Sequence, residues 1–110
     1  MVIERPWKIK VTVVRKLDMR DIFGDEDVGS SESMDPVCDR FNVGDEFIIA
    51  DKGCPEGFCP GAFYDIYKWI NGMAFGANYF WMKKPGQMYS CCTDGLRPII
   101  FKLERLDEQF

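Results

Sequence analysis

Hydrophobic and polar residues alternate over residues 7–15, WKIKVTVVR. The odd positions from Trp7 to Val13 are apolar, and Lys8, Lys10 and Thr12 lie between them. Because successive side chains of a strand point to opposite faces, this pattern predicts a half-buried β-strand.

A helical period replaces this alternation after residue 59. Pro60 suits the first position of a helix, where a missing N–H costs nothing. The apolar residues then recur at helical spacing, which predicts one buried stripe on a helix over residues 60–72: Phe63, Ile66, Tyr67 and Ile70. Gly72 or Gly76 can end this helix.

Turn residues separate several short β-type segments. A strand is predicted over 46–50, after the turn at Gly44-Asp45. Pro85-Gly86 predicts a hairpin between 78–84 and 87–92, and Asp94-Gly95 predicts a second hairpin into the last strand. We therefore expect one α+β domain over residues 1–110, with about five mostly antiparallel strands forming a curled sheet or small barrel and the helix packed on it.

Residues 17–37 differ in character, because they carry seven acidic side chains. One helical turn is predicted near residues 18–23. The acidic spacing does not fit the calcium-binding template, so we interpret the segment as a solvated acidic loop.

Composition narrows the class of protein. A net charge of −4 argues against a nucleic-acid surface, and no apolar run approaches the ~18 residues of a membrane span. The start of the chain lacks the pattern of a signal peptide, so its five cysteines suggest free thiols in the cytoplasm. Histidine is absent, which excludes a Ser-His or Cys-His dyad within the chain.

Cys59 is the most informative thiol. With Pro60 as the first helical residue, Cys59 is the N-cap, where the helix dipole stabilises a thiolate. A small packed residue is an equal alternative for this position. Cys54 and Cys59 form a Cys-x4-Cys pair, which occurs at zinc and iron–sulfur sites, although the pair alone is a weak signal.

The other cysteines follow from strand geometry and loop position. Cys91 and Cys92 must face opposite sides of a strand, and Cys92 lies nearer the following turn. We therefore expect Cys92 in a site and Cys91 in packing. Cys38 follows the acidic loop. An exposed free thiol in a loop is prone to oxidation unless it is shielded or has a function, which favours a role for Cys38 in a site.

Three segments together resemble a known family: FNVGDEFII, PEGFCPGAFYDIYKWI and CCTDGLRPIIFKLERL. This family consists of small prokaryotic proteins, frequent in anaerobes, with no established activity. The resemblance covers the chain from Trp7 onward. It implies recurrent cysteines at Cys38, Cys59 and Cys92 and an acidic residue at Asp94, whereas Cys54 looks like an addition and Cys91 recurs less generally.

Two kinds of function follow as hypotheses. In the first, Cys38, Cys59 and Cys92 bind zinc or an iron–sulfur cluster, and Asp94, water, a substrate or a partner protein takes an open position. In the second, the chain binds a small aromatic molecule without metal, in a pocket that includes Trp81.

A structural or assembly subunit is a further alternative, and exposed sheet edges favour a homo-oligomer. Thiol catalysis ranks below metal binding, because no histidine can serve as the base.

Overall fold

A computed structural model describes residues 5–26, 28, 35–51 and 53–110. Four strands are present: β1 (Trp7–Lys16), β2 (Glu46–Ile49), β3 (Gln87–Cys91) and β4 (Ile99–Gln109). The helices are the short α1 (Met19–Phe23) and the main α2 (Pro60–Ala74).

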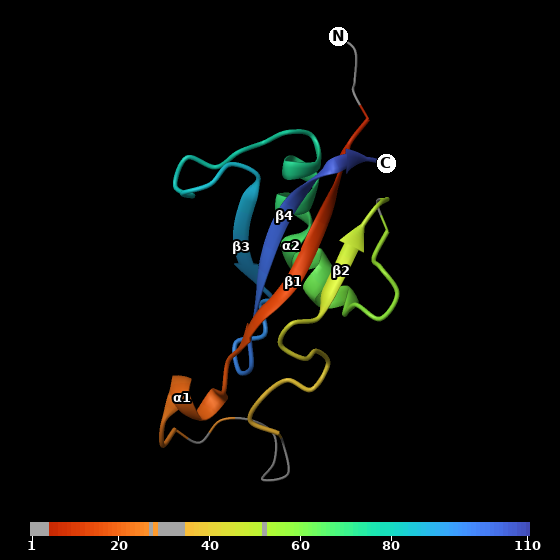
Figure 1. Ribbon diagram of the computed structural model, residues 1–110. Helices are drawn as coiled ribbons and strands as arrows, with labels where there is room; N and C mark the ends of the chain where they lie inside the picture. The colour runs from red at the N-terminus through yellow and green to blue at the C-terminus, as the bar shows by residue number, and fades with distance from the viewer. Residues whose placement is uncertain (1–4, 27, 29–34, 52) are drawn as a thin grey trace.

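The strands form one open antiparallel sheet in the order β2-β1-β4-β3 (Figure 1). The long strands β1 and β4 pair at its centre, with Val11 opposite Leu103. The pairing register shifts between Trp7 and Ile9 and again between Val13 and Arg15. β2 and β3 are the two edges.

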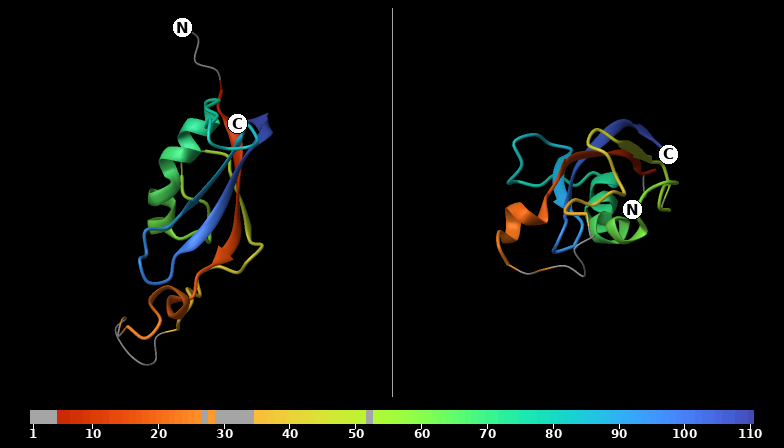
Figure 2. Two further views of the ribbon diagram at one scale, coloured as in Figure 1. Left: turned by 90° about the vertical axis from the view of Figure 1, so that its left-hand side faces the viewer. Right: turned by 90° about the horizontal axis from the view of Figure 1, so that it is seen from below.

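The helix α2 packs along one face of the sheet (Figure 2). The inward positions of β1 are fully buried at Ile9, Val11 and Val13, as the alternation predicted. Ile66 of α2 and Phe101 of β4 are also completely buried between the two layers. The opposite face of the sheet carries ion pairs, with Lys10 lying 3.6 Å from Glu46 and 3.7 Å from Glu104, together with the exposed Ile48 and Tyr89.

The predicted α+β class is confirmed, and α2 begins at Pro60 as expected. It ends at Ala74, where Gly76 adopts φ 99° and the N–H of Ala77 donates to the carbonyl of Gly72. This is a Schellman termination, which needs a residue without Cβ strain at Gly76. The predicted helical turn is α1, whose N-cap Asp18 accepts a hydrogen bond from the N–H of Arg20.

Two expectations of the fold were wrong. The described sheet has four strands and is open, whereas about five strands in a curled sheet or small barrel were expected. Residues 78–84 are not a strand, because their aromatic rings pack on one another and on α2 instead of alternating across a sheet. The predicted acidic excursion lies partly outside the described residues. No helix in the described part of the chain is long and apolar enough to cross a bilayer.

Candidate functional site

A tight turn places Cys59 at the start of α2. The N–H of Phe58 donates to the carbonyl of Pro55 at 3.2 Å, and Gly57 adopts φ 82°, as the third position of a type II turn requires. The turn directs Phe58 into the core, where its ring lies 5.0 Å from that of Phe41 and 5.4 Å from that of Phe101. Cys59 follows directly and is half-buried.

Cys59 is the N-cap of α2, as predicted. Its backbone is extended (φ −71°, ψ 119°), but its side chain makes no capping hydrogen bond. Pro60 has no N–H, and among the described residues no acceptor faces the N–H groups of Gly61 and Ala62. The positive end of the helix dipole is therefore left open beside the sulfur.

The fold brings Cys38, Cys59 and Cys92 to the same end of the sheet. All three are half-buried and pack against one hydrophobic core. Cys38 lies close in sequence to Phe41, which contacts Phe58 beside Cys59. Cys92 follows β3 at the end of the sheet where α2 begins (Figure 1).

Hydrogen bonds hold the β3–β4 turn against α2. The carboxylate of Asp65 accepts from the N–H of Thr93 at 2.7 Å and from its hydroxyl at 3.0 Å. Asp94 accepts from the N–H groups of Leu96 and Arg97 within its own turn. The carboxylate of Asp94 therefore stabilises its own turn, in addition to the role as a ligand that was predicted for it.

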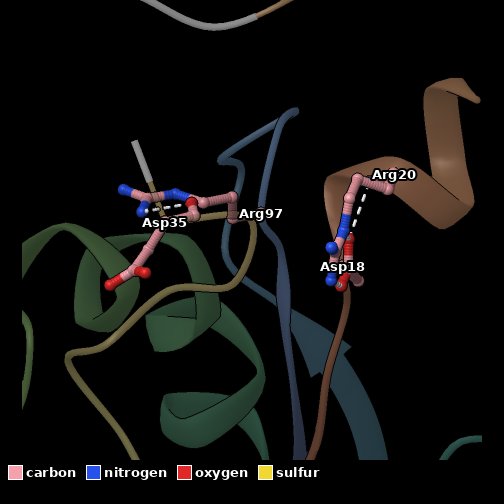
Figure 3. Close-up of polar contacts among 4 residues, drawn as sticks. All are labelled: Asp18, Arg20, Asp35 and Arg97. Carbon is pink, nitrogen blue, oxygen red and sulfur yellow. Dashed lines mark hydrogen bonds and ion pairs between the residues drawn. The ribbon is translucent and has the colours of Figure 1, made fainter. Parts of the chain in front are cut away.

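Arg97 joins this turn to the segment that leads to Cys38. Its guanidinium donates to the backbone carbonyl of Asp35 at 3.0 Å (Figure 3). The Nε of Arg97 is buried and has no hydrogen-bond partner among the described residues. Burying a polar atom without a hydrogen-bond partner costs free energy, so the guanidinium of Arg97 is only partly satisfied in this structure.

The three sulfurs do not form a metal-binding group in this structure. Across residues 5–26, 28, 35–51 and 53–110, no three His, Cys, Asp or Glu side chains lie close enough together to hold a metal ion. The Sγ of Cys92 instead accepts a hydrogen bond from the N–H of Ile99 at 3.3 Å. Cys91 is exposed, so the expectation that it packs in the interior was wrong.

Cys54 lies beside a groove at the start of α2. The groove has a volume of about 390 Å³, and its walls are largely apolar and aromatic: Cys54, Pro60, Phe63, Tyr64 and Tyr67. The sulfur of Cys54 lies 3.7 Å from the carbonyl oxygens of Pro55 and Phe58. Partial burial raises the pKa of the Cys54 thiol, and the charge that Cys59 carries as a thiolate adds to this rise.

This groove was not predicted from the sequence. Its signal was present, because Pro60, Phe63, Tyr64 and Tyr67 recur at helical spacing on the side of α2 that follows Cys54. A second cavity, of only about 20 Å³ between α2 and the far end of β1, is too small for a ligand.

Trp81, the predicted ligand-binding aromatic, lies away from these thiols. It belongs to a cluster beyond the other end of α2, where it stacks on Tyr79 with ring centroids 5.2 Å apart. It lines neither the groove nor the small cavity. The structure therefore separates Trp81 from the cysteines.

No family model, no curated protein and no solved structure matches this chain. The resemblance drawn from its sequence stays a prediction, and its function has to be argued from its geometry.

Proposed function

We propose that the chain binds a small, largely apolar molecule with a planar ring in the groove beside the start of α2. The observation that carries this proposal is the groove itself, with its volume of about 390 Å³ and its aromatic walls. Small-molecule sites of proteins are typically about 300–1,000 Å³ and are lined by such side chains.

The polar groups of the groove are few and uncharged. They are the thiol of Cys54 and the hydroxyls of Tyr64 and Tyr67. Desolvation raises the pKa of the Cys54 thiol, and the protonated thiol can donate a weak hydrogen bond. Such a lining favours a neutral ring with one or two acceptor atoms over an anion.

Tyr64 is the most exposed wall of this groove. Its side chain is 82% exposed, whereas the neighbouring Phe63 is buried and its ring lies 5.5 Å from that of Tyr67. A bound ring can rest on the fixed pair and be covered by Tyr64, which would bury Tyr64 on binding.

The test is a screen of small aromatic compounds against the folded chain by two-dimensional NMR. Binding in the groove predicts shifts confined to residues 53–67, and Tyr64→Ala should weaken the affinity about fivefold, since one aromatic contact contributes roughly 1 kcal/mol. The matched control is Tyr89→Ala on β3, because Tyr89 is also exposed (46%) and lies outside the groove. Absence of any hit, or hits that Tyr64→Ala leaves unchanged, would exclude the groove as the site.

A second candidate function is metal binding by Cys38, Cys59 and Cys92. The specific observation in its favour is that three half-buried thiols pack against the same core, one of them at the N-cap of α2, whose side chain makes no capping hydrogen bond. Thiolates suit zinc, copper(I) or an iron–sulfur cluster, and the open helix end would offset their charge. The loops that carry Cys38 and Cys92 would have to close on Cys59, because the described side chains do not form such a group as they stand.

This candidate is tested by elemental analysis of protein purified without oxygen. Stoichiometric zinc or iron that the triple Cys→Ser variant loses, while Cys54→Ser keeps it, supports the site. Metal-free folded protein refutes it and leaves the groove proposal untouched. A thiolate site of this kind, like the five free cysteines, fits a reducing cytoplasm.

A further inference from the structure

One end of the molecule carries a projecting acidic arm, residues 17–26. Its helix α1 has no buried residue and contacts no other helix or strand among the described residues. The arm is attached at its base, where the N–H of Leu17 donates to the carbonyl of Pro98 and that of Met19 to Pro36. Both views show it standing away from the sheet (Figures 1 and 2).

The arm combines negative charge with an apolar residue. Asp21, Asp25 and Glu26 are exposed and have no ion-pair partner among the described residues. Ile22 lies between them and is 44% exposed. Asp18 is already paired with Arg20 at 2.6 Å (Figure 3), so it serves the helix itself.

The opposite end carries an aromatic loop, residues 75–86. Phe80 is 94% exposed and Trp81 53%, and their rings meet edge to face at 5.1 Å. The cluster continues through Tyr79 to Trp69 on α2. Exposed aromatic side chains that lie together in this way are typical of interaction surfaces.

This aromatic loop lies in the most basic part of an acidic chain. Between Asp65 and Asp94 the sequence has three lysines and no acidic residue, although the net charge of the chain is −4. Lys68 lies over the Trp69 ring at 4.8 Å, and Lys83 and Lys84 follow the aromatic residues directly. None of the three has an ion-pair partner among the described residues.

We propose that the acidic arm of one copy of this chain docks on the aromatic loop of a second copy. The two surfaces match in charge, and each offers exposed apolar side chains for the contact. They lie at opposite ends of the sheet (Figure 1), so an arm cannot reach the loop of its own molecule. The contact joins unlike surfaces, so it builds either a dimer in which the two arms dock reciprocally, or rings and chains of more copies.

The test is sedimentation of the full-length protein at several concentrations and salt levels. The proposal predicts concentration-dependent species larger than a monomer, whose association weakens roughly tenfold when salt rises to a level at which the Debye length falls to ~3 Å.

Charge reversal identifies the partners of the contact. The arm variant is Asp21→Lys with Asp25→Lys and Glu26→Lys, and the loop variant is Lys68→Glu with Lys83→Glu and Lys84→Glu. Each variant alone should remain monomeric, because two like charges then face each other. An equal mixture of both should assemble again, since each reversed surface finds a complementary one.

The control for net charge compares two variants that both move it from −4 to −6. Lys83→Gln with Lys84→Gln should weaken assembly, and Arg40→Glu, at an exposed arginine outside both surfaces, should not. A monomer under all conditions overturns the proposal, as does a dimer that neither reversed variant affects. Binding of single-stranded DNA or anionic vesicles to a monomeric chain, lost in the loop variant, would assign the loop to that partner instead.

Discussion

The two ends of α2 are built on different principles. At its C-terminal end, Arg105 of β4 donates to the carbonyls of Met73 and Ala77 at 3.1 and 2.8 Å and to the Oδ1 of Asn78 at 2.7 Å. Asn78 also accepts from the N–H of Gly86 at 2.8 Å, which closes the aromatic loop. The positive guanidinium lies where the helix dipole is negative.

At the N-terminal end of α2, no comparable bonds pair the backbone groups of the first turn among the described residues, although Asp65 further along the helix binds Thr93. Its N-cap is a cysteine whose side chain makes no capping bond, and serine, threonine, aspartate and asparagine are the residues that cap helices best. No acidic residue lies in the first turn. Polar groups at this end are left available, whereas those at the other end are used to fix a loop.

This difference between the two ends of α2 indicates where a small ligand could bind. The C-terminal end of α2, where Arg105 is hydrogen-bonded to Met73, Ala77 and Asn78, holds the aromatic loop in place. The N-terminal end, with its uncapped N–H groups and an aromatic groove, has lost some stability and kept the capacity to bind a small ligand. We therefore place the candidate sites at the start of α2 and assign the end of α2 a positioning role.

Removing the Arg105 side chain should have the largest effect on this contrast. Arg105→Met keeps the apolar stem and leaves the carbonyls of Met73 and Ala77 without their donor. We expect the free energy of unfolding to fall by about 2–4 kcal/mol, since hydrogen bonds to charged groups contribute roughly 1.5–3 kcal/mol each and do not add fully. Urea denaturation measures the loss, and tryptophan fluorescence should shift to the red as the loop loosens.

The control for Arg105→Met is Arg40→Met, because Arg40 is exposed and its side chain makes no hydrogen bond or ion pair among the described residues. It should change the free energy of unfolding by less than about 0.5 kcal/mol. If Arg105→Met costs no more than the control, the C-terminal end of α2 is not the fixed end that the hydrogen bonds indicate.

Replacing Cys59 should act in the opposite direction. In Cys59→Ser the hydroxyl can accept from the N–H at the second or third helical position, which the sulfur does not do. We expect a gain in stability of about 0.5–1 kcal/mol, and no gain for Cys59→Ala. Thermal unfolding of the two variants side by side checks this. A loss of more than about 1 kcal/mol in both would mean that the packing of the sulfur against the core outweighs the cap.

The regular parts of this fold could be predicted from local patterns. β1 follows from strict alternation and α2 from the spacing of Phe63, Ile66 and Ile70, because burial on one face is a property of the sequence period. Residues 78–84 also look like a strand, being rich in aromatic side chains. Their conformation is decided by tertiary contacts: the hydroxyl oxygen of Tyr79 lies only 2.7 Å from the position that a Cβ on Gly72 would take.

The candidate site shows the same limit. The position of Cys59 at a helix N-cap could be predicted from Pro60 alone, and it is confirmed. The clamp by Arg105 could not, because its partners lie 27 to 32 residues away in sequence. Cysteine spacing likewise gives no information on whether sulfurs from three separate loops approach one another, which depends on how those loops pack.

The smallest expected effect concerns the pH at which Cys54 reacts. Partial burial and the neighbouring Cys59 raise the pKa of the Cys54 thiol, and only the thiolate is alkylated. Because the folded pKa lies above the unfolded one, this thiol contributes stability below the unfolded pKa, and the contribution disappears as pH rises through the folded pKa.

Alkylation of Cys54, followed by peptide mapping, should therefore reach half its maximal rate at higher pH in the native chain than in the same chain unfolded in urea. In Cys59→Ala the midpoint should move part of the way back, because burial remains after the neighbouring thiol is gone. Equal midpoints in the folded and unfolded chain would show that the wall of the groove is as well solvated as an open loop, and the preference for a neutral ring would lose its basis.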